Sequence, residues 1–146
     1  MPRHGDDRVN QVSSARAPHE LFQDMIDQLR ATIIVDAVIL FGSQATGMTS
    51  EHSDYDLVII GRFTQDRWAR VRMVLAMKPR VPLDVFCFTP EEFRKAFDAY
   101  DLTAVDAIGD GIVLHGDRFV QPYKEEYQAR VRAGMHKRRS VLVLPP

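Results

Sequence analysis

The chain has 146 residues, of which 45% are hydrophobic and 27% are charged, and its formal net charge is −1. This length predicts one domain with a substantial core, and the near-zero charge excludes a global attraction to nucleic acid or to an anionic membrane. The single cysteine excludes an internal disulfide. Because the N-terminus is also polar and no apolar run is long enough to span a bilayer, we expect a cytoplasmic protein.

The beginning of the chain predicts an arm followed by a helix. Residues 1–17 have little apolar content and no periodicity, which predicts a flexible N-terminal arm. Pro18 suits the first position of a helix, and apolar residues recur at helical spacing over residues 20–31. The expected apolar face consists of Leu21, Phe22, Met25, Ile26 and Leu29.

A strand and a turn with anion-binding character come next. Residues 33–41 are expected to form a strand, and its apolar run over 37–41 stops at Gly42-Ser43. A glycine lets a phosphate approach its backbone closely, and Ser43 adds a hydroxyl donor. Residues 44–46 suit the start of a helix, whose N-terminal amides favour an anion. The plainer alternative for Gly42 and Ser43 is a turn that only closes a strand.

Two aspartates directly precede the next apolar run, residues 57–60. Successive strand side chains point to opposite faces, so Asp54 and Asp56 should share one face, with Tyr55 in the core on the other. Two carboxylates this close resist ionising together unless a divalent cation neutralises them. Oxygen ligands favour Mg²⁺ or Mn²⁺ over Zn²⁺. A solvated strand start is the alternative interpretation, and His52 in the preceding loop is expected to be solvated.

A helix and a third strand follow Gly61. Thr64 is the expected N-cap; the side chains expected to point inward are Trp68, Val71, Val74, Leu75 and Met77. In the strand 83–88, Asp84, Phe86 and Phe88 should share a face. Asp84 has apolar neighbours, and desolvation of its carboxylate costs several kcal/mol unless a cation or hydrogen bonds compensate. A salt bridge of Asp84 to Arg80 or Arg62 is the alternative.

The rest of the chain predicts helices around one more strand. Residues 89–92 form a capping box that starts a helix, a second helical piece covers 102–108, and a short strand covers 112–115. Residues 120–135 are helical in pattern and lead to the basic cluster 136–139 and an apolar, strand-like tail over 141–146. This order predicts an α/β (α+β) fold, with a small mixed sheet and helices packed against it.

The motifs resemble those of the DNA polymerase β-like nucleotidyltransferases, and within them the minimal nucleotidyltransferases. The family pattern is Gly-Ser, about ten residues, and Asp-x-Asp, and here Gly42-Ser43 is followed by residues 44–53 and by Asp54-Tyr55-Asp56. The family places a third carboxylate on the next strand, where Asp84 stands. The resemblance covers residues 20–115. It implies a nucleotidyltransferase domain over 18–116, with a C-terminal helix and tail over 117–146.

The resemblance implies that the protein transfers AMP from ATP to a hydroxyl with the help of Mg²⁺ or Mn²⁺. Asp54 and Asp56 would hold the metal ion that binds the triphosphate, and Asp84 would join them at a second ion beside the acceptor hydroxyl. The Gly42 amide and the Ser43 hydroxyl would bind the β- and γ-phosphates. Arg62, Lys78, Arg80, Arg94 and Lys95 are further candidates for phosphate contacts.

The sequence leaves the identity of the acceptor open. Minimal nucleotidyltransferases are often antitoxins paired with a HEPN-domain ribonuclease toxin, so the resemblance implies a HEPN-domain toxin as partner and one of its tyrosines as acceptor. One alternative is transfer to a small molecule such as an aminoglycoside. Another is a non-catalytic antitoxin that neutralises its partner by binding. The basic cluster 136–139 suits RNA or an acidic partner, or a solvated surface.

Overall fold

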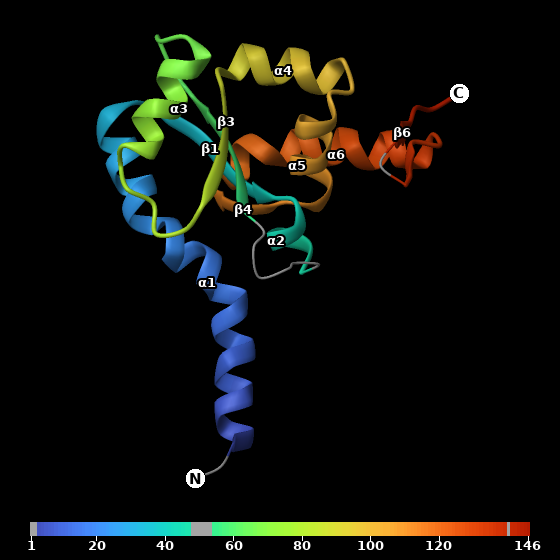
Figure 1. Ribbon diagram of the computed structural model, residues 1–146. Helices are drawn as coiled ribbons and strands as arrows, with labels where there is room; N and C mark the ends of the chain where they lie inside the picture. The colour runs from blue at the N-terminus through green and yellow to red at the C-terminus, as the bar shows by residue number, and fades with distance from the viewer. Residues whose placement is uncertain (1–2, 48–53, 140) are drawn as a thin grey trace.

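A four-stranded mixed sheet organises the molecule, with the strand order β3-β2-β1-β4 (Figure 1). The computed structural model describes residues 3–47, 54–139 and 141–146, with side chains from residue 18 onward. The strands are β1 Val35–Phe41, β2 Tyr55–Gly61, β3 Leu83–Phe88 and β4 Ile112–His115. β1 is antiparallel to both β2 and β4, while β2 and β3 are parallel. The predicted small mixed sheet is confirmed.

Helices cover both faces of this sheet (Figure 1). Their bounds are α1 Arg3–Thr32, α2 Ser43–Thr46, α3 Arg67–Leu75, α4 Pro90–Asp98, α5 Leu102–Asp110 and α6 Asp117–Arg132. Alternate residues of the strands pack against α1 and α3 on one face and against α4, α5 and α6 on the other. Burial of apolar side chains on both faces explains why the central strands read as continuous hydrophobic runs.

The α1 face of the core follows the sequence pattern closely. Phe22, Met25, Ile26 and Leu29 are buried against the sheet, as predicted, and Leu21 packs at the edge of the same cluster. The helix itself begins at Arg3, so residues 3–17 continue it where the sequence predicts a flexible arm, and Pro18 lies inside it. Once a packed segment has nucleated a helix, each further turn adds hydrogen bonds at little cost.

The beginning of α3 differs from the prediction. Asp66, and not Thr64, is the N-cap, and its Oδ1 accepts a hydrogen bond of 2.9 Å from the Ala69 amide. Val74 is buried as expected, but Trp68 is 75% exposed and Leu75 is also exposed. The inward position is taken by Arg70, because its guanidinium finds buried acceptors there.

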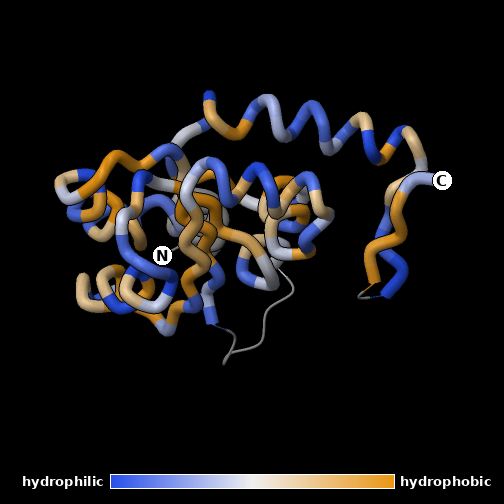
Figure 2. Tube along the Cα trace, turned by 90° about the horizontal axis from the view of Figure 1, so that it is seen from above, coloured by the Kyte–Doolittle hydropathy of each residue, from blue (hydrophilic) through white to orange (hydrophobic). Residues whose placement is uncertain are grey.

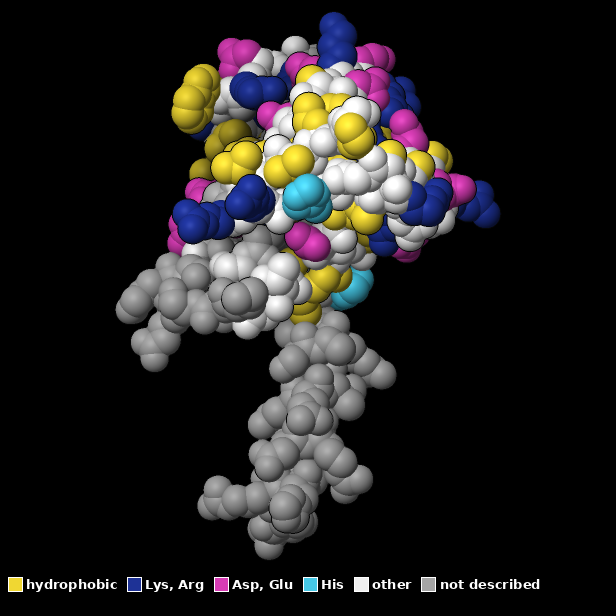
Figure 3. Space-filling model, turned by 90° about the vertical axis from the view of Figure 1, so that its right-hand side faces the viewer, with side chains coloured by type: hydrophobic (Ala, Val, Ile, Leu, Met, Phe, Trp, Pro, Cys, Tyr) yellow, Lys and Arg dark blue, Asp and Glu magenta, His cyan; other side chains and the backbone are white. Residues whose placement is uncertain are grey.

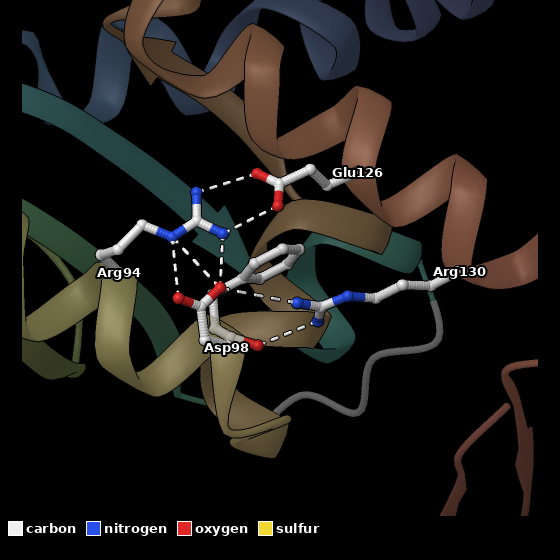
Figure 4. Close-up of polar contacts among 5 residues, drawn as sticks. Arg94, Asp98, Glu126 and Arg130 are labelled. Carbon is white, nitrogen blue, oxygen red and sulfur yellow. Dashed lines mark hydrogen bonds and ion pairs between the residues drawn. The ribbon is translucent and has the colours of Figure 1, made fainter.

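The helices α4 and α6 are joined by a polar network (Figure 4). Arg94 on α4 donates two hydrogen bonds of 2.8 Å to Glu126 on α6, and it also pairs with Asp98 one turn along its own helix. Arg130 on α6 donates to the Phe97 carbonyl oxygen at 2.9 Å. Charged, two-pronged hydrogen bonds fix orientation as well as distance, so α6 is held at a defined angle to α4.

Two smaller findings concern α4 and α5. The predicted capping box is present, with the Glu92 amide donating to Thr89 Oγ1 and the Thr89 amide donating to Glu92 Oε1. α5 continues through Gly109 to Asp110, beyond the predicted end at residue 108. The Tyr127 ring occupies the space that a side chain at Gly109 would need, which explains a glycine inside this helix.

The C-terminal tail forms a two-stranded hairpin of β5 His136–Arg138 and β6 Val141–Val143. The hairpin stands off the end of α6, away from the four-stranded sheet (Figure 2). Lys137 Nζ lies 2.8 Å from Asp106 Oδ1 on α5. On the end of the molecule that carries the hairpin, hydrophobic side chains lie between groups of Lys and Arg (Figure 3). None of the described helices combines the length and the apolar character needed to cross a membrane.

Candidate active site

The strand register brings Asp56 and Asp84 together. β2 and β3 are parallel, and in their register Asp56 lies directly opposite Asp84. Neighbouring strands are about 4.8 Å apart, and paired residues point to the same face. Asp56 and Asp84 therefore lie side by side on the α4–α6 face of the sheet, although 27 residues separate them in the sequence. The register thus places Asp56 and Asp84 on the same face of neighbouring strands, as expected if these two strands pair.

Asp54 adds a third carboxylate to this end of the sheet. It precedes Asp56 by two residues and is exposed, at the start of the described segment 54–139. The pKa of Asp56 is raised, first by partial burial and then by the negative charges of Asp84 and Asp54. All three carboxylates thus interact electrostatically. His52, expected to be solvated, lies outside the described residues.

Gly42 lies against the Asp56 carboxylate. Phe41, the last residue of β1, pairs with Asp56, so the chain turns at Gly42 directly beside it. Gly42 has φ 76° and ψ −161°, and a Cβ at this position would overlap Asp56 Oδ2. Only glycine combines this positive φ with so close an approach. Ser43 then opens the short helix α2, whose Ala45 and Thr46 amides bond to the Gly42 carbonyl.

The carboxylates do not converge on one point in this conformation. Within residues 3–47, 54–139 and 141–146, no three acidic, His or Cys side chains are arranged to hold one metal ion. A carboxylate reorients at little cost by rotation about its side-chain bonds. A donor set of carboxylate oxygens suits Mg²⁺ or Mn²⁺. The residues present therefore fit a hard divalent cation.

Asp84 differs from the prediction in its surroundings. It is exposed, so the expected desolvation by its apolar neighbours is wrong. Those neighbours in sequence point to the opposite face of β3, where Leu83 and Val85 pack with the α1 side of the core. The alternative salt bridges are also not formed, because Arg80 pairs with Asp24 and Arg62 pairs with Asp36, both at 3.1 Å.

Three of the five basic residues expected to contact phosphate have structural roles. Arg62, Arg80 and Arg94 all form ion pairs with acidic side chains of the chain itself. Sequence reasoning gave no role to Phe86, which is 38% exposed beside Asp84 and packs edge-to-face on Phe41 at 5.6 Å. Its position two residues after Asp84 is the signal that could have found it, since i and i+2 share a strand face.

A protein-family model described as "Polymerase beta, Nucleotidyltransferase" matches residues 23–99, more than half of the chain. The chain belongs to the polymerase β nucleotidyltransferase family. The matched part of this nucleotidyltransferase includes Gly42, Ser43 and all three aspartates, together with β1, β2 and β3. The family match and the mixed sheet confirm the predicted fold.

Solved structures similar to this nucleotidyltransferase are distant. A candidate nucleotidyltransferase from Sulfolobus solfataricus is 17% identical, with a TM-score of 0.48, over 70% of this chain and 83% of that one. A mutant MntA–HpeT toxin–antitoxin is 20% identical, with a TM-score of 0.49, over 73% and 86%. A complex of tri-AMPylated Shewanella oneidensis HEPN toxin with MNT antitoxin is 16% identical, with a TM-score of 0.41, over 78% and 93%. Comparison with curated proteins finds no match.

Proposed function

We propose that this nucleotidyltransferase transfers AMP from ATP to a tyrosine hydroxyl of a HEPN-domain ribonuclease toxin and acts as its antitoxin. The observation that carries the chemistry is the direct register of Asp56 with Asp84, beside the glycine turn at Gly42. The resemblance to minimal nucleotidyltransferases supports the choice of a protein tyrosine as acceptor.

The proposed reaction is a displacement at the α-phosphorus of ATP. The acceptor oxygen bonds to that phosphorus, the bond to the bridging oxygen breaks, and pyrophosphate leaves with the bonding electrons. Asp84 is the carboxylate nearest the open edge of the sheet, since β3 is an edge strand. We assign Asp84 the role of accepting the hydroxyl proton.

The remaining residues bind and orient the nucleotide. Asp54 and Asp56 would hold the metal ion together with the triphosphate, and Asp84 would complete a second position with them. A bound Mg²⁺ or Mn²⁺ neutralises phosphate charge and lowers the pKa of a coordinated hydroxyl. The Gly42 amide and Ser43 hydroxyl would donate to the β- and γ-phosphate oxygens. Most of the rate gain would come from positioning and charge stabilisation.

The test is a transfer assay with ATP labelled at the α-phosphate, Mg²⁺ and a purified HEPN-domain partner. We expect label on a tyrosine of the partner, and a loss of about 10³-fold or more in rate with Asp56→Asn or Asp84→Asn, since several kcal/mol of charge stabilisation disappear. Asp24→Asn is the matched control. Asp24 forms an exposed pair with Arg80, and such pairs contribute little.

Each other outcome contradicts the proposal. Label that persists in Asp84→Asn would remove the assigned role of that carboxylate. An inhibited toxin without label would show that the partner is neutralised by contact alone. Label on an added aminoglycoside, but not on the protein partner, would identify a small-molecule transferase.

A further inference from the structure

One edge of the main sheet is open along β3. The Pro82 carbonyl accepts a hydrogen bond of 3.0 Å from the Tyr55 amide, so the Pro82 peptide group faces β2. Peptide groups alternate in direction along a strand. The peptide groups of residues 84, 86 and 88 thus face β2 as well. Those of Leu83, Val85 and Cys87 point outward, away from the sheet. Among the described residues, no strand pairs with this edge.

Among the side chains that the structure describes, one caps the open edge, at a single position. Arg70 Nη1 donates a hydrogen bond of 3.2 Å to the Cys87 carbonyl oxygen. No such contact is recorded within the described part of the chain for the Val85 amide or carbonyl. A row of outward peptide groups is a template on which another extended segment can pair.

A groove runs beside this edge, between β3 and α3, which lie next to each other (Figure 1). Its volume is about 210 Å³, with Arg67, Trp68 and Val71 on the α3 side and residues 85–88 on the β3 side. Trp68 is 75% exposed and Phe86 is 38% exposed. Exposed aromatic side chains around a groove are typical of binding sites for a protein partner.

The α3 wall of the groove is positively charged. The helix contains three arginines and no acidic residue. Arg70 is neutralised by Glu92, whereas the structure records no ion pair for Arg67 or Arg72 among its described residues. Arg67 lies at the groove, with its guanidinium 5.5 Å from the centre of the Phe88 ring. An acidic side chain on an incoming segment would complement Arg67.

The groove is continuous with the candidate active site. Phe86 lines the groove, and Asp84 lies two residues before it on the same face of β3. Residues i and i+2 of a strand are about 6–7 Å apart. A segment paired along β3 would therefore bring its residues to within side-chain reach of Asp84.

We infer that the open edge of β3 binds an extended segment of the acceptor protein. One apolar side chain of this segment fills the groove between Trp68 and Phe86, and an acidic side chain beside it pairs with Arg67. This inference rests on the proposed function, because it describes how the acceptor reaches Asp84.

The first test uses Trp68 as a reporter, since it is the only tryptophan in the chain. The HEPN-domain partner, made without tryptophan, is added in the absence of ATP. We expect the Trp68 emission to shift to shorter wavelength and its quenching by iodide to fall. Hydrogen exchange of the Val85 amide should slow in the complex, because a new backbone hydrogen bond protects it. A complex that leaves both signals unchanged would overturn the inference.

The second test separates docking from chemistry. Arg67→Glu should raise the KM for the acceptor protein by about tenfold or more with little change in kcat, since it weakens binding without touching the reacting atoms. Arg72→Glu on the same helix is the control, because it changes the net charge equally but lies outside the groove lining. Equal effects of the two variants would indicate general electrostatic attraction and overturn the groove assignment.

Failure of the inference and failure of the proposed function look different. If label reaches the acceptor but Trp68 and Val85 do not respond, the acceptor docks elsewhere. If both respond and no label is transferred, the docking surface stands and the transfer reaction is wrong. A Trp68 shift that depends on the concentration of this chain alone would identify a second copy as occupant, and a shift with Mg–ATP alone would identify the nucleotide. Either result would overturn the inference.

Discussion

Arg70 on α3 and Glu92 in the first turn of α4 form an ion pair, with Arg70 Nη1 2.6 Å from Glu92 Oε1. Arg70 Nε also donates to the Gln65 carbonyl at 2.7 Å, and the same guanidinium reaches the Cys87 carbonyl. Glu92 in turn accepts the Thr89 amide at 2.7 Å. This pair thus joins α3 and α4 to β3, the strand that carries Asp84.

Replacing Arg70 with methionine should lower the free energy of unfolding. The side chain is buried, with 7% of the residue exposed. Its loss removes the donor to two backbone carbonyls and leaves the Glu92 carboxylate with the Thr89 amide but without its cationic partner. Because Glu92 is partly exposed and water can reach it, we expect about 2–3 kcal/mol. Urea denaturation followed by circular dichroism measures this change. Arg72→Met should stay within about 0.5 kcal/mol, and equal stability of the two variants would contradict the structural role.

The same ion pair makes stability depend on pH. The hydrogen bond from Arg70 lowers the pKa of Glu92 below its usual value of 4.5, with a further contribution from the Thr89 amide. A lowered carboxyl pKa stabilises the folded state above the unfolded-state pKa, and this contribution is lost as the pH falls through the folded-state pKa. We therefore expect Glu92→Gln to flatten the loss of stability below pH 4.5, measured by urea denaturation at several pH values. Glu125→Gln on the exposed side of α6 should keep the wild-type slope.

A matched pair of glycine variants tests the contact between Gly42 and Asp56. Gly42 and Gly47 have nearly equal φ values of 76° and 78°. A Cβ at Gly42 would overlap Asp56, whereas no described residue would lie within 4 Å of a Cβ at Gly47. Both alanine variants should lose about 1 kcal/mol of stability from backbone strain. Gly42→Ala alone should also lose ATP binding, measured by calorimetry. Normal ATP binding by Gly42→Ala would show that the Asp56 carboxylate does not need this space.

Divalent cations should reverse the sign of the change in unfolding free energy that removal of the Asp56 charge causes. Without a cation, Asp56→Asn should raise the free energy of unfolding by less than about 1 kcal/mol, because it removes repulsion from Asp84 and Asp54. With Mg²⁺ at about one hundred times its dissociation constant, the wild type should gain about 2.7 kcal/mol by mass action. The variant should gain much less. Thermal unfolding with and without Mg²⁺ measures both effects, and an equal gain in the two proteins would place the cation elsewhere.

Local patterns made most of the fold predictable. The strand 83–88 and the capping box at Thr89 were predicted from alternation and from a side-chain motif, and both depend on contacts between near neighbours in sequence. The predictions that failed concern side chains whose burial depends on tertiary contacts. Trp68 has the spacing of a core residue, but Arg70 occupies the inward position because its acceptors come from β3 and α4, which no local pattern contains.

In the candidate site, too, local patterns predicted some features, while others depend on tertiary structure. Spacing placed Asp54 and Asp56 on one face, and the family resemblance supplied Asp84 as the third carboxylate. The direct pairing of Asp56 with Asp84 depends on the register of two parallel strands, which sequence alone does not determine. The exposure of Asp84 was missed because its neighbours in sequence pack on the opposite face of β3.

The carboxylates and the glycine turn belong to a contiguous stretch, β1 to β3, in which each strand pairs with the next along the chain. β4 reaches β1 only after a long excursion through α4 and α5. Contacts between nearby segments form faster than contacts across large loops, because less chain entropy is lost in closing them. We expect β2 and β3 to pair early during folding, before β4 and α6 join the rest of the molecule. The negatively charged site then exists in a partly folded molecule, where a cation stabilises it.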